Sequence, residues 1–227
     1  MDNGESDIDT RGFEICQVGT THNLVANKFC VGRPHLLLLT ADGSRRQYEA
    51  LDRADLTAAW NALTAVGRDY FVFFNGGQDA GCSRLHKHMQ LMPYVDGHLA
   101  SFLDRQGEEG DEPDVPFHWF HERLDPSTTT PLGLCEVYAR LLEKATAVGQ
   151  GLGENAASAP PGAVCPHSMI FTRRWMLVIP RRRAIANGAA GNAMGMIGII
   201  WVAQTSEMDL WLKQGPLQVL RELGVPK

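Results

Sequence analysis

The sequence predicts an α+β protein in which strands and helices follow one another in mixed order. Runs of apolar, aromatic or β-branched residues typical of strands occupy residues 22–40, 70–74, 85–94 and 169–179. Apolar residues with helical spacing occupy residues 52–66, 132–147 and 192–223. Because these elements do not alternate as repeated βαβ units, an α+β fold is favoured over a parallel α/β fold.

The first half of the chain is expected to hold a hairpin, a helix and two further strands. Residues 22–40 contain two apolar runs separated by Gly32-Arg33-Pro34, a pattern that predicts a β-hairpin or two adjacent strands. Asp52 is a suitable N-cap for the helix expected over residues 52–66. The aromatic run at 70–74 predicts a strand that leads into the glycine-rich loop NGGQDAGCS, and the next strand follows this loop.

The second half follows an acidic stretch rich in glycine and proline at residues 104–116, which predicts a linker. Residues 169–179 predict a strand or a hairpin that Pro180 ends. The C-terminal helices are expected to break at Gly215-Pro216. At the opposite end of the chain, residues 1–12 are polar and acidic, and we expect them to be disordered or displaced.

The composition limits the classes of function. The 227 residues carry a formal net charge of -5, so bulk attraction to nucleic acid or to an anionic membrane is not expected. The most apolar window, residues 194–203, is too short to cross a bilayer. Five scattered cysteines without a CxxC pair predict reduced thiols rather than disulfides or a zinc ribbon. The acidic start does not resemble a signal or transit peptide, so we expect a cytoplasmic protein, with the nucleus as a second compartment.

Residues 75–90 concentrate groups suited to chemistry on phosphates. Alternate side chains of a strand face the same way, so His86, His88 and Gln90 are expected on one face. The loop before them contains Gly76, Gly77, Gly81 and Ser83, and the backbone N–H groups of such a loop can approach an anion closely. Together these features predict a site in which one imidazole attacks phosphorus while hydrogen-bond donors stabilise the oxygens.

Other interpretations of these residues remain open at this point. Without the loop, the pattern His-x-His-x-Gln fits a structural role or a partial metal site as well as a nucleophile. A zinc site needs a third or fourth His, Cys or acidic ligand, and Gln is a poor one. A Walker loop is excluded because Cys82-Ser83 stands where Lys-Ser/Thr is required.

Isolated histidines and arginine runs elsewhere receive structural interpretations. We interpret six histidines as surface or satisfied core residues: His22, His35, His98, His118, His121 and His167. Thr172-Arg173-Arg174 and Arg181-Arg182-Arg183 are interpreted as charges on an exposed edge strand and at its exit.

The motif FFNGGQDAGCSRLHKHMQLMP resembles the signature of the fungal and bacterial diadenosine tetraphosphate phosphorylases, also called ATP adenylyltransferases, of the histidine-triad superfamily. The stretch HNLVANKFCVGRPHLLLLT before it is similar to the same family. So are MIFTRRWMLVIPRRR and NAMGMIGIIWVAQ after it. The resemblance covers about residues 20–225.

The resemblance implies a histidine-triad-like antiparallel sheet flanked by helices, with a C-terminal segment of the ATP adenylyltransferase type. It divides the chain into an N-terminal catalytic portion, residues 1–104, and a C-terminal portion, residues 114–227. It implies reversible phosphorolysis of diadenosine tetraphosphate to ADP and ATP, with this dinucleoside polyphosphate, ATP, ADP and phosphate as ligands. A divalent cation such as Mg²⁺ is implied by the family alone, and we expect no metal site built from the protein's own residues.

The resemblance also implies roles for individual residues. The family's nucleophile is the second His of the motif, which is His88 here, and His86 and Gln90 complete the catalytic set. Its substrate contacts match Asn27, Lys28, Asn75, Gly81, Cys82, Ser83, Arg84, Gln90, Asn192 and Met194. In the implied double displacement, His88 attacks the α-phosphorus, ATP leaves, and phosphate then releases ADP. His86 would fix the tautomer and orientation of its neighbours, and Lys28 would offset phosphate charge.

The beginning of the chain departs from the family pattern. Family members carry a further N-terminal segment that supplies a phosphate-binding lysine, and the residues before His22 do not resemble it. We therefore expect an N-terminally truncated chain with weak or absent activity, present as a monomer or in weak self-association. The alternatives are a catalytically impaired nucleotide-binding paralogue or fragment, and a sugar-nucleotide nucleotidyltransferase. The latter is expected to have an HPHxQ core and paired zinc ligands, whereas Lys87 separates the two histidines here.

Overall fold

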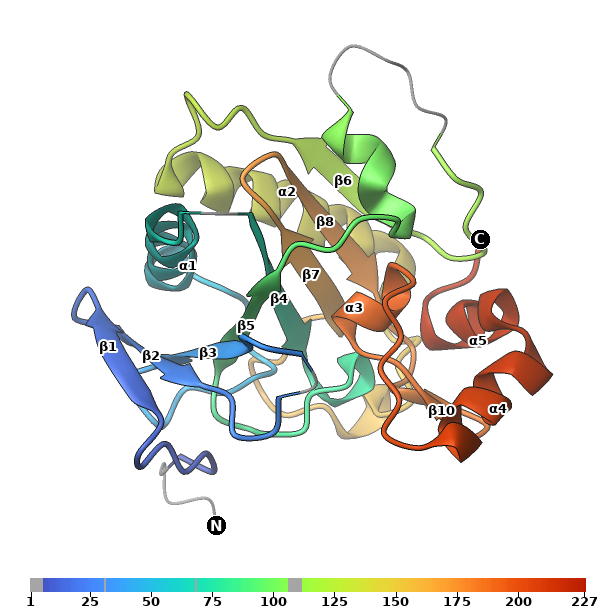
Figure 1. The fold of residues 1–227 in the computed structure, drawn as a ribbon. Helices are drawn as coiled ribbons and strands as arrows, with labels where there is room; N and C mark the ends of the chain where they lie inside the picture. The colour runs from blue at the N-terminus through green and yellow to red at the C-terminus, as the bar shows by residue number, and fades with distance from the viewer. Residues whose placement is uncertain (1–5, 31, 68, 106–111) are drawn as a thin grey trace.

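The computed structural model describes residues 6–30, 32–67, 69–105 and 112–227. They form an eight-stranded sheet in the order β1-β2-β3-β5-β4-β7-β8-β6, with helices on both faces (Figure 1). All neighbouring strands are antiparallel. The strands are β1 (Glu14–Val18), β2 (His22–Ala26), β3 (Leu36–Thr40), β4 (Tyr70–Gly76), β5 (His88–Pro93), β6 (Phe120–Arg123), β7 (His167–Phe171) and β8 (Trp175–Pro180). The predicted α+β fold with a large antiparallel sheet is confirmed.

Five α-helices and several short elements complete the described part of the chain. The helices are α1 (Arg53–Ala65), α2 (Pro131–Gly149), α3 (Ala193–Met196), α4 (Thr205–Gln214) and α5 (Pro216–Leu223). The short elements are the 3-10 turns η1 (Gln78–Ala80), η2 (Leu99–Asp104) and η3 (Ala156–Ser158), and the hairpin of β9 (Ile185–Ala186) and β10 (Ala189–Ala190). No helix among the described residues is long and apolar enough to cross a membrane.

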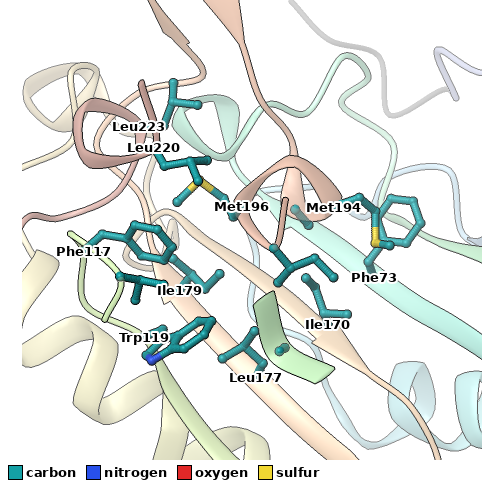
Figure 2. Close-up of a cluster of buried hydrophobic side chains, with 14 of the residues drawn as sticks. Phe73, Phe117, Trp119, Ile170, Leu177, Ile179, Met194, Met196, Leu220 and Leu223 are labelled. Carbon is teal, nitrogen blue, oxygen red and sulfur yellow. The ribbon is translucent and has the colours of Figure 1, made fainter. Parts of the chain in front are cut away.

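The central strands are buried on both faces, which explains their nearly continuous apolar sequences. In β4, Tyr70, Val72 and Phe74 pack toward α1 and α2, whereas Phe71 and Phe73 pack toward the other face. That other face is covered by η2, α3, α4 and α5, and Figure 2 shows part of its core around Ile179, Leu220 and Leu223. Alternation of side chains along each strand therefore feeds two separate hydrophobic layers.

Helix α1 is tied to the strand that carries the predicted site. Asp52 caps the helix as expected, and its partner in the capping box is Asp55. The Asp55 carboxylate also lies 2.6 Å from Lys87 Nζ and 3.0 Å from His22 Nε2, and all three side chains are buried. Lys87 therefore points to the helical side of the sheet, opposite to its neighbours His86 and His88. A buried carboxylate with several polar partners fixes the position of the strand against the helix.

Several boundaries differ from those expected from sequence. The hairpins and helices at 22–40, 52–66, 132–147, 169–179 and 192–223 are present, and α4 and α5 meet at Gly215 as predicted. The strand expected from residue 85 begins only at His88, and β1 and β6 were not foreseen. Of the expected linker, residues 106–111 lie outside the described residues, but Val115 is buried in the core. The division at 104 and 114 stays a prediction.

Two structural interpretations from sequence were wrong. Residues 1–12 were expected to be disordered or displaced, and the disorder is wrong for Ser6 to Gly12, because Asp7 accepts hydrogen bonds from the backbone of Leu85 and His86. Residues 1–5 lie outside the described residues. The interpretation of Arg181 as an exposed charge at the end of a strand is also wrong, because its side chain is fully buried. A chain of carbonyl and hydroxyl acceptors, described below, makes that burial possible.

We expect the free energy of unfolding to decrease as the pH falls from about 6.5 to 4. Burial lowers the pKa of His167 to about 4, against about 6.5 in the unfolded chain. Between these two pH values the unfolded state binds a proton that the folded state does not bind. Stability on the order of 3 kcal/mol, which is fully present above about pH 6.5, is therefore lost as the pH falls toward 4. Urea denaturation at a series of pH values measures this. The His167→Gln variant should have a shallower pH dependence, and equal dependence in both proteins would contradict the assignment.

Candidate active site

A cleft of about 250 Å³ opens where the glycine-rich loop meets the start of β5. It is lined by residues 7–10, residues 25–29, the loop at 81–84 and β5, together with His35, Leu37, Asn75, Asn192 and Trp201. Ten of the residues predicted from sequence line it: Asn27, Lys28, Asn75, Gly81, Cys82, Ser83, Arg84, His88, Gln90 and Asn192. Residues from both halves of the chain thus converge on one concave surface.

Two of the predicted site residues do not line this cleft. Met194 is 1% exposed and packs in the core together with Phe73 (Figure 2). The ring of His86 is directed instead to Thr40, with Nε2 2.9 Å from both the carbonyl and the hydroxyl oxygen. Its Nδ1 lies 2.7 Å from Ser6 Oγ. Regular strand geometry starts only at His88, so the alternation expected over residues 86–90 holds for His88 and Gln90.

His88 is held in the state that a nucleophile requires. Its Nδ1 lies 2.8 Å from the backbone oxygen of His86, and because a carbonyl only accepts, Nδ1 carries the proton. Burial lowers the pKa of His88, so the ring is neutral at neutral pH. The lone pair is then on Nε2, for which the described residues offer no hydrogen-bond partner. The contribution of His86 to this arrangement comes from its backbone oxygen.

The side-chain amide of Gln47 fixes the backbone of His88. Gln47 Oε1 accepts from His88 N at 2.7 Å, and Gln47 Nε2 donates to His88 O at 3.0 Å and to Asn75 O at 3.2 Å. The side chain is 1% exposed, and it bridges β5 to the end of β4 where direct strand pairing has stopped. Nothing in the local sequence SRRQYE singles out this glutamine, because its partners are far away in the chain.

Gln90 is oriented by a residue that the sequence interpretation set aside. His35 Nε2 donates to Gln90 Oε1 at 2.9 Å, and Asn27 Nδ2 lies 3.2 Å from His35 Nδ1. Since the amide oxygen is occupied, the NH₂ group of Gln90 is available as a donor in the cleft. The pairing of Leu37 with Gln90 in adjacent strands brings His35 into reach. Trp201, also unforeseen, lines the cleft with its ring centroid 5.8 Å from that of His35.

The N-terminal segment adds an acidic wall to the cleft. Asp7 accepts from Leu85 N at 2.8 Å and from His86 N at 2.9 Å. Although burial opposes ionisation, these two hydrogen bonds lower the pKa of Asp7 below its ordinary value. Lys28 also lines the cleft, and its Nζ lies about 6 Å from the ring centroids of Phe13 and Phe29, without an ion pair among the described residues. The cleft therefore contains fixed groups of both charges.

The glycine-rich loop depends on backbone conformations that favour glycine. Gly77 and Gly81 have φ angles of 91° and 87°. A Cβ atom on Gly81 would lie 3.4 Å from the backbone oxygen of Gly191, so the loop also packs closely on the C-terminal half. Burial raises the pKa of the neighbouring Cys82 to about 11, which leaves its thiol protonated. Cys82 is therefore a poor nucleophile at neutral pH, because the thiolate is the reactive form.

Arg181 joins the two halves of the cleft from behind. Its guanidinium donates to the backbone oxygens of Ala80, Arg183, Gly191 and Leu223 and to Ser168 Oγ, over distances of 2.7 to 3.3 Å. All five N–H donors are thus used without a carboxylate. Gly81 and Asn192, which line the cleft, each follow directly after one of these acceptors. Arg181 therefore sets the distance between the loop and the C-terminal wall.

A neutral, buried histidine beside a glycine-rich loop, on an antiparallel sheet, is an arrangement suited to nucleotidyl transfer. Comparisons with known proteins give the family. The model of the Ap4A phosphorylase N-terminal domain matches residues 10–100, and that of the ATP adenylyltransferase C-terminal domain matches residues 113–226. The chain belongs to the Ap4A phosphorylase and ATP adenylyltransferase family.

Two proteins of Saccharomyces cerevisiae are similar in sequence. Diadenosine 5',5'''-P1,P4-tetraphosphate phosphorylase 2 is 26% identical over 217 residues, and Protein APA1 is 29% identical over 232 residues. The matches cover 83% and 90% of this chain, which spans 64% and 69% of the length of the two yeast proteins. The crystal structure of yeast Ap4A phosphorylase Apa2 in complex with AMP is similar with a TM-score of 0.75 and 26% identity, over 91% of this chain and 74% of that one.

We expect the Gln47→Leu variant to lose several kcal/mol of stability. The substitution roughly preserves volume but leaves the backbone N–H and oxygen of His88 and the oxygen of Asn75 without partners. Each buried, unsatisfied group costs about 1–3 kcal/mol. Urea denaturation measures the change, with the exposed Gln78→Leu as a matched control that should stay within about 0.5 kcal/mol. A Gln47→Leu protein as stable as the control would contradict the bridging role.

Proposed function

We propose that this chain transfers the adenylyl group of diadenosine tetraphosphate to phosphate, giving ADP and ATP, through an adenylyl-His88 intermediate. The observation that carries the proposal is the tautomer of His88. With its Nδ1 proton held by the backbone oxygen of His86, the ring presents an Nε2 lone pair in a cleft that is lined by phosphate-binding groups. Yeast Apa2, a structural relative, was crystallised in complex with Ap4A.

The proposed reaction has two displacement steps. In the first, the Nε2 lone pair of His88 forms a bond to the α-phosphorus, and the bond from that phosphorus to the bridging oxygen breaks, so that ATP leaves with the electron pair. In the second, a phosphate oxygen attacks the same phosphorus, the N–P bond breaks, and ADP leaves as His88 becomes neutral again. The positive charge of the intermediate ring is stabilised by the backbone oxygen of His86, which accepts from Nδ1.

Donors around His88 are placed to stabilise the phosphoryl oxygens. The NH₂ group of Gln90 is free because His35 occupies its oxygen. Ser83, Arg84 and Lys28 also line the cleft, and the last two supply positive charge. Charge-assisted hydrogen bonds of this kind are among the strongest that a protein makes to phosphate.

A divalent cation such as Mg²⁺ does not find a ready protein site. The described residues contain no group of three His, Cys, Asp or Glu that could hold a metal ion. Asp7 is occupied by the backbone of Leu85 and His86, and Asp9 by Arg11. We therefore place any such cation with the phosphates of the substrate.

The proposed compartment is the cytoplasm, where the five cysteines, all free in the structure, stay reduced.

We expect His88 to become covalently adenylylated. Brief exposure of the chain to diadenosine tetraphosphate without phosphate should give an AMP adduct by intact-mass spectrometry, and the adduct should be acid-labile because it is a phosphoramidate. The His88→Ala variant should give no adduct, and its turnover should fall by several orders of magnitude. A second variant, His118→Ala, changes a histidine outside the cleft and should behave as the parent protein. An adduct that persists in His88→Ala would overturn the mechanism, and its absence from the parent would favour a catalytically impaired paralogue.

We expect the Gln90→His variant to divert the intermediate to water. The amide of Gln90 holds phosphoryl oxygens but does not act as an acid or base near neutral pH, whereas a third histidine can assist water. In the presence of phosphate, the ratio of AMP to ADP among the products should therefore rise. Nucleotide chromatography measures this ratio, and an unchanged ratio in an active variant would remove this role from Gln90.

A further inference from the structure

The segment before β1 lies along the cleft that contains His88. Residues 6–12, called here the N-terminal strap, precede the first strand, and residues 7–10 line the cleft together with the loop at 81–84. With the strap in this position the cleft has a volume of about 250 Å³, below the roughly 300–1,000 Å³ that is typical of small-molecule sites. The strap therefore takes up part of the space that a dinucleotide would need.

A carboxylate of the strap sits where the backbone is suited to bind a phosphate. Asp7 Oδ2 accepts from Leu85 N at 2.8 Å, and Asp7 Oδ1 accepts from His86 N at 2.9 Å. Successive backbone N–H groups that converge on one point form an anion-binding concavity. Although burial raises the pKa of Asp7, these hydrogen bonds and the nearby charge of Arg84 lower it below its ordinary value, so the carboxylate is ionised at neutral pH.

This carboxylate acts on the nucleophile and on its neighbour. His86, whose N–H donates to Asp7, also accepts the Nδ1 proton of His88 through its backbone oxygen. Burial lowers the pKa values of both histidine rings, and the negative charge of Asp7 opposes this effect at each of them. The same charge repels the phosphates of an approaching ligand. It also occupies two donors that directly follow Ser83 and Arg84 in the lining of the cleft.

The strap is attached by contacts that can open without unfolding the protein. Its side chains are exposed or half-buried, and none of those described belongs to the buried core. Besides Asp7, it is attached through Ser6 Oγ, which lies 2.7 Å from His86 Nδ1. Other side-chain hydrogen bonds stay within the segment, such as those between Asp9 and Arg11. A segment with few buried apolar contacts opens at a low cost in free energy.

We propose that the N-terminal strap is an autoinhibitory element, in which the Asp7 carboxylate takes the place of a substrate phosphate until the ligand displaces it. The proposal rests on the proposed function, since it concerns access to the same cleft. In the closed arrangement Asp7 holds the N–H groups of Leu85 and His86. In the open arrangement these donors are free to accept a phosphate beside Arg84. The apparent affinity for the ligand is then reduced by the fraction of molecules that are open.

The first test removes the carboxylate. Binding of diadenosine tetraphosphate is measured by calorimetry in the His88→Ala background, where the ligand is not consumed. Asp7→Ala should lower the dissociation constant roughly 10-fold, as expected when a closed state that holds about nine-tenths of the molecules is lost. Asp209→Ala removes the same charge from an exposed position on α4, outside the cleft lining, and should leave the dissociation constant unchanged. Thermal unfolding of each variant verifies that the fold is retained.

The second test follows the strap itself. Hydrogen exchange, measured by mass spectrometry in the His88→Ala background, is compared with and without diadenosine tetraphosphate. Exchange should increase in residues 6–12 when the ligand binds, whereas exchange in the loop at 81–84 should decrease, because the strap leaves as the phosphates arrive. In the Asp7→Ala variant the strap should exchange rapidly in both states.

The outcomes separate this proposal from the proposed function. If Asp7→Ala binds the ligand with equal or lower affinity, the strap does not inhibit binding. If the ligand protects residues 6–12 from exchange, the strap belongs to the binding site and does not compete for it. Either result leaves the adduct on His88 intact, so it overturns the autoinhibitory role alone. A chain that forms no adduct and binds no dinucleotide, with or without Asp7, would overturn both.

Discussion

The side-chain amide of Gln47 is the interaction on which the cleft depends. Strand pairing between β4 and β5 ends at Phe73 and Gln90, two residues short of His88. Beyond that point the Gln47 side chain replaces the missing hydrogen bonds between the strands. Its oxygen accepts from His88 N, and its nitrogen donates to the backbone oxygens of His88 and Asn75. The two strands can therefore separate enough to admit a ligand without leaving buried backbone groups unsatisfied.

The buried histidines of the site are neutral. His88 and His35 both have pKa values lowered by burial, and each has one ring nitrogen committed to a fixed partner. The proton positions of both rings are thereby set before a ligand arrives. Arg181 is the exception, a buried cation whose five donors all meet neutral acceptors. The nearby charge that acts on Arg181 is the buried carboxylate of Asp79, which partly offsets the loss of its hydration.

Local sequence patterns were sufficient for the main elements and for most of the cleft. The helices and hairpins were predictable because apolar periodicity and caps such as Asp52 are local signals. The His-x-His-x-Gln motif and its loop indicated a segment that lines the cleft. Gln47, His35 and Asp7 were missed because their roles come from partners 41, 55 and 78 positions away. Met194 was misplaced for the related reason that no local signal tells whether a methionine faces a cleft or a core. The direction of the His86 ring was also missed, because it depends on the residue at which β5 begins.

The junction of the two matched family segments lies inside the sheet. β4 from the first segment pairs with β7 from the second, from Val72 opposite Phe171 to Gly76 opposite His167. At this seam a Cβ atom on Gly76 would lie 2.8 Å from the ring of His167, so the fit tolerates little change. If the two segments were synthesised as separate polypeptides, each would present a long, apolar, unpaired strand edge, which is a template for aggregation. Split versions of this protein would therefore function only when both fragments are made together and assemble before either edge finds another partner.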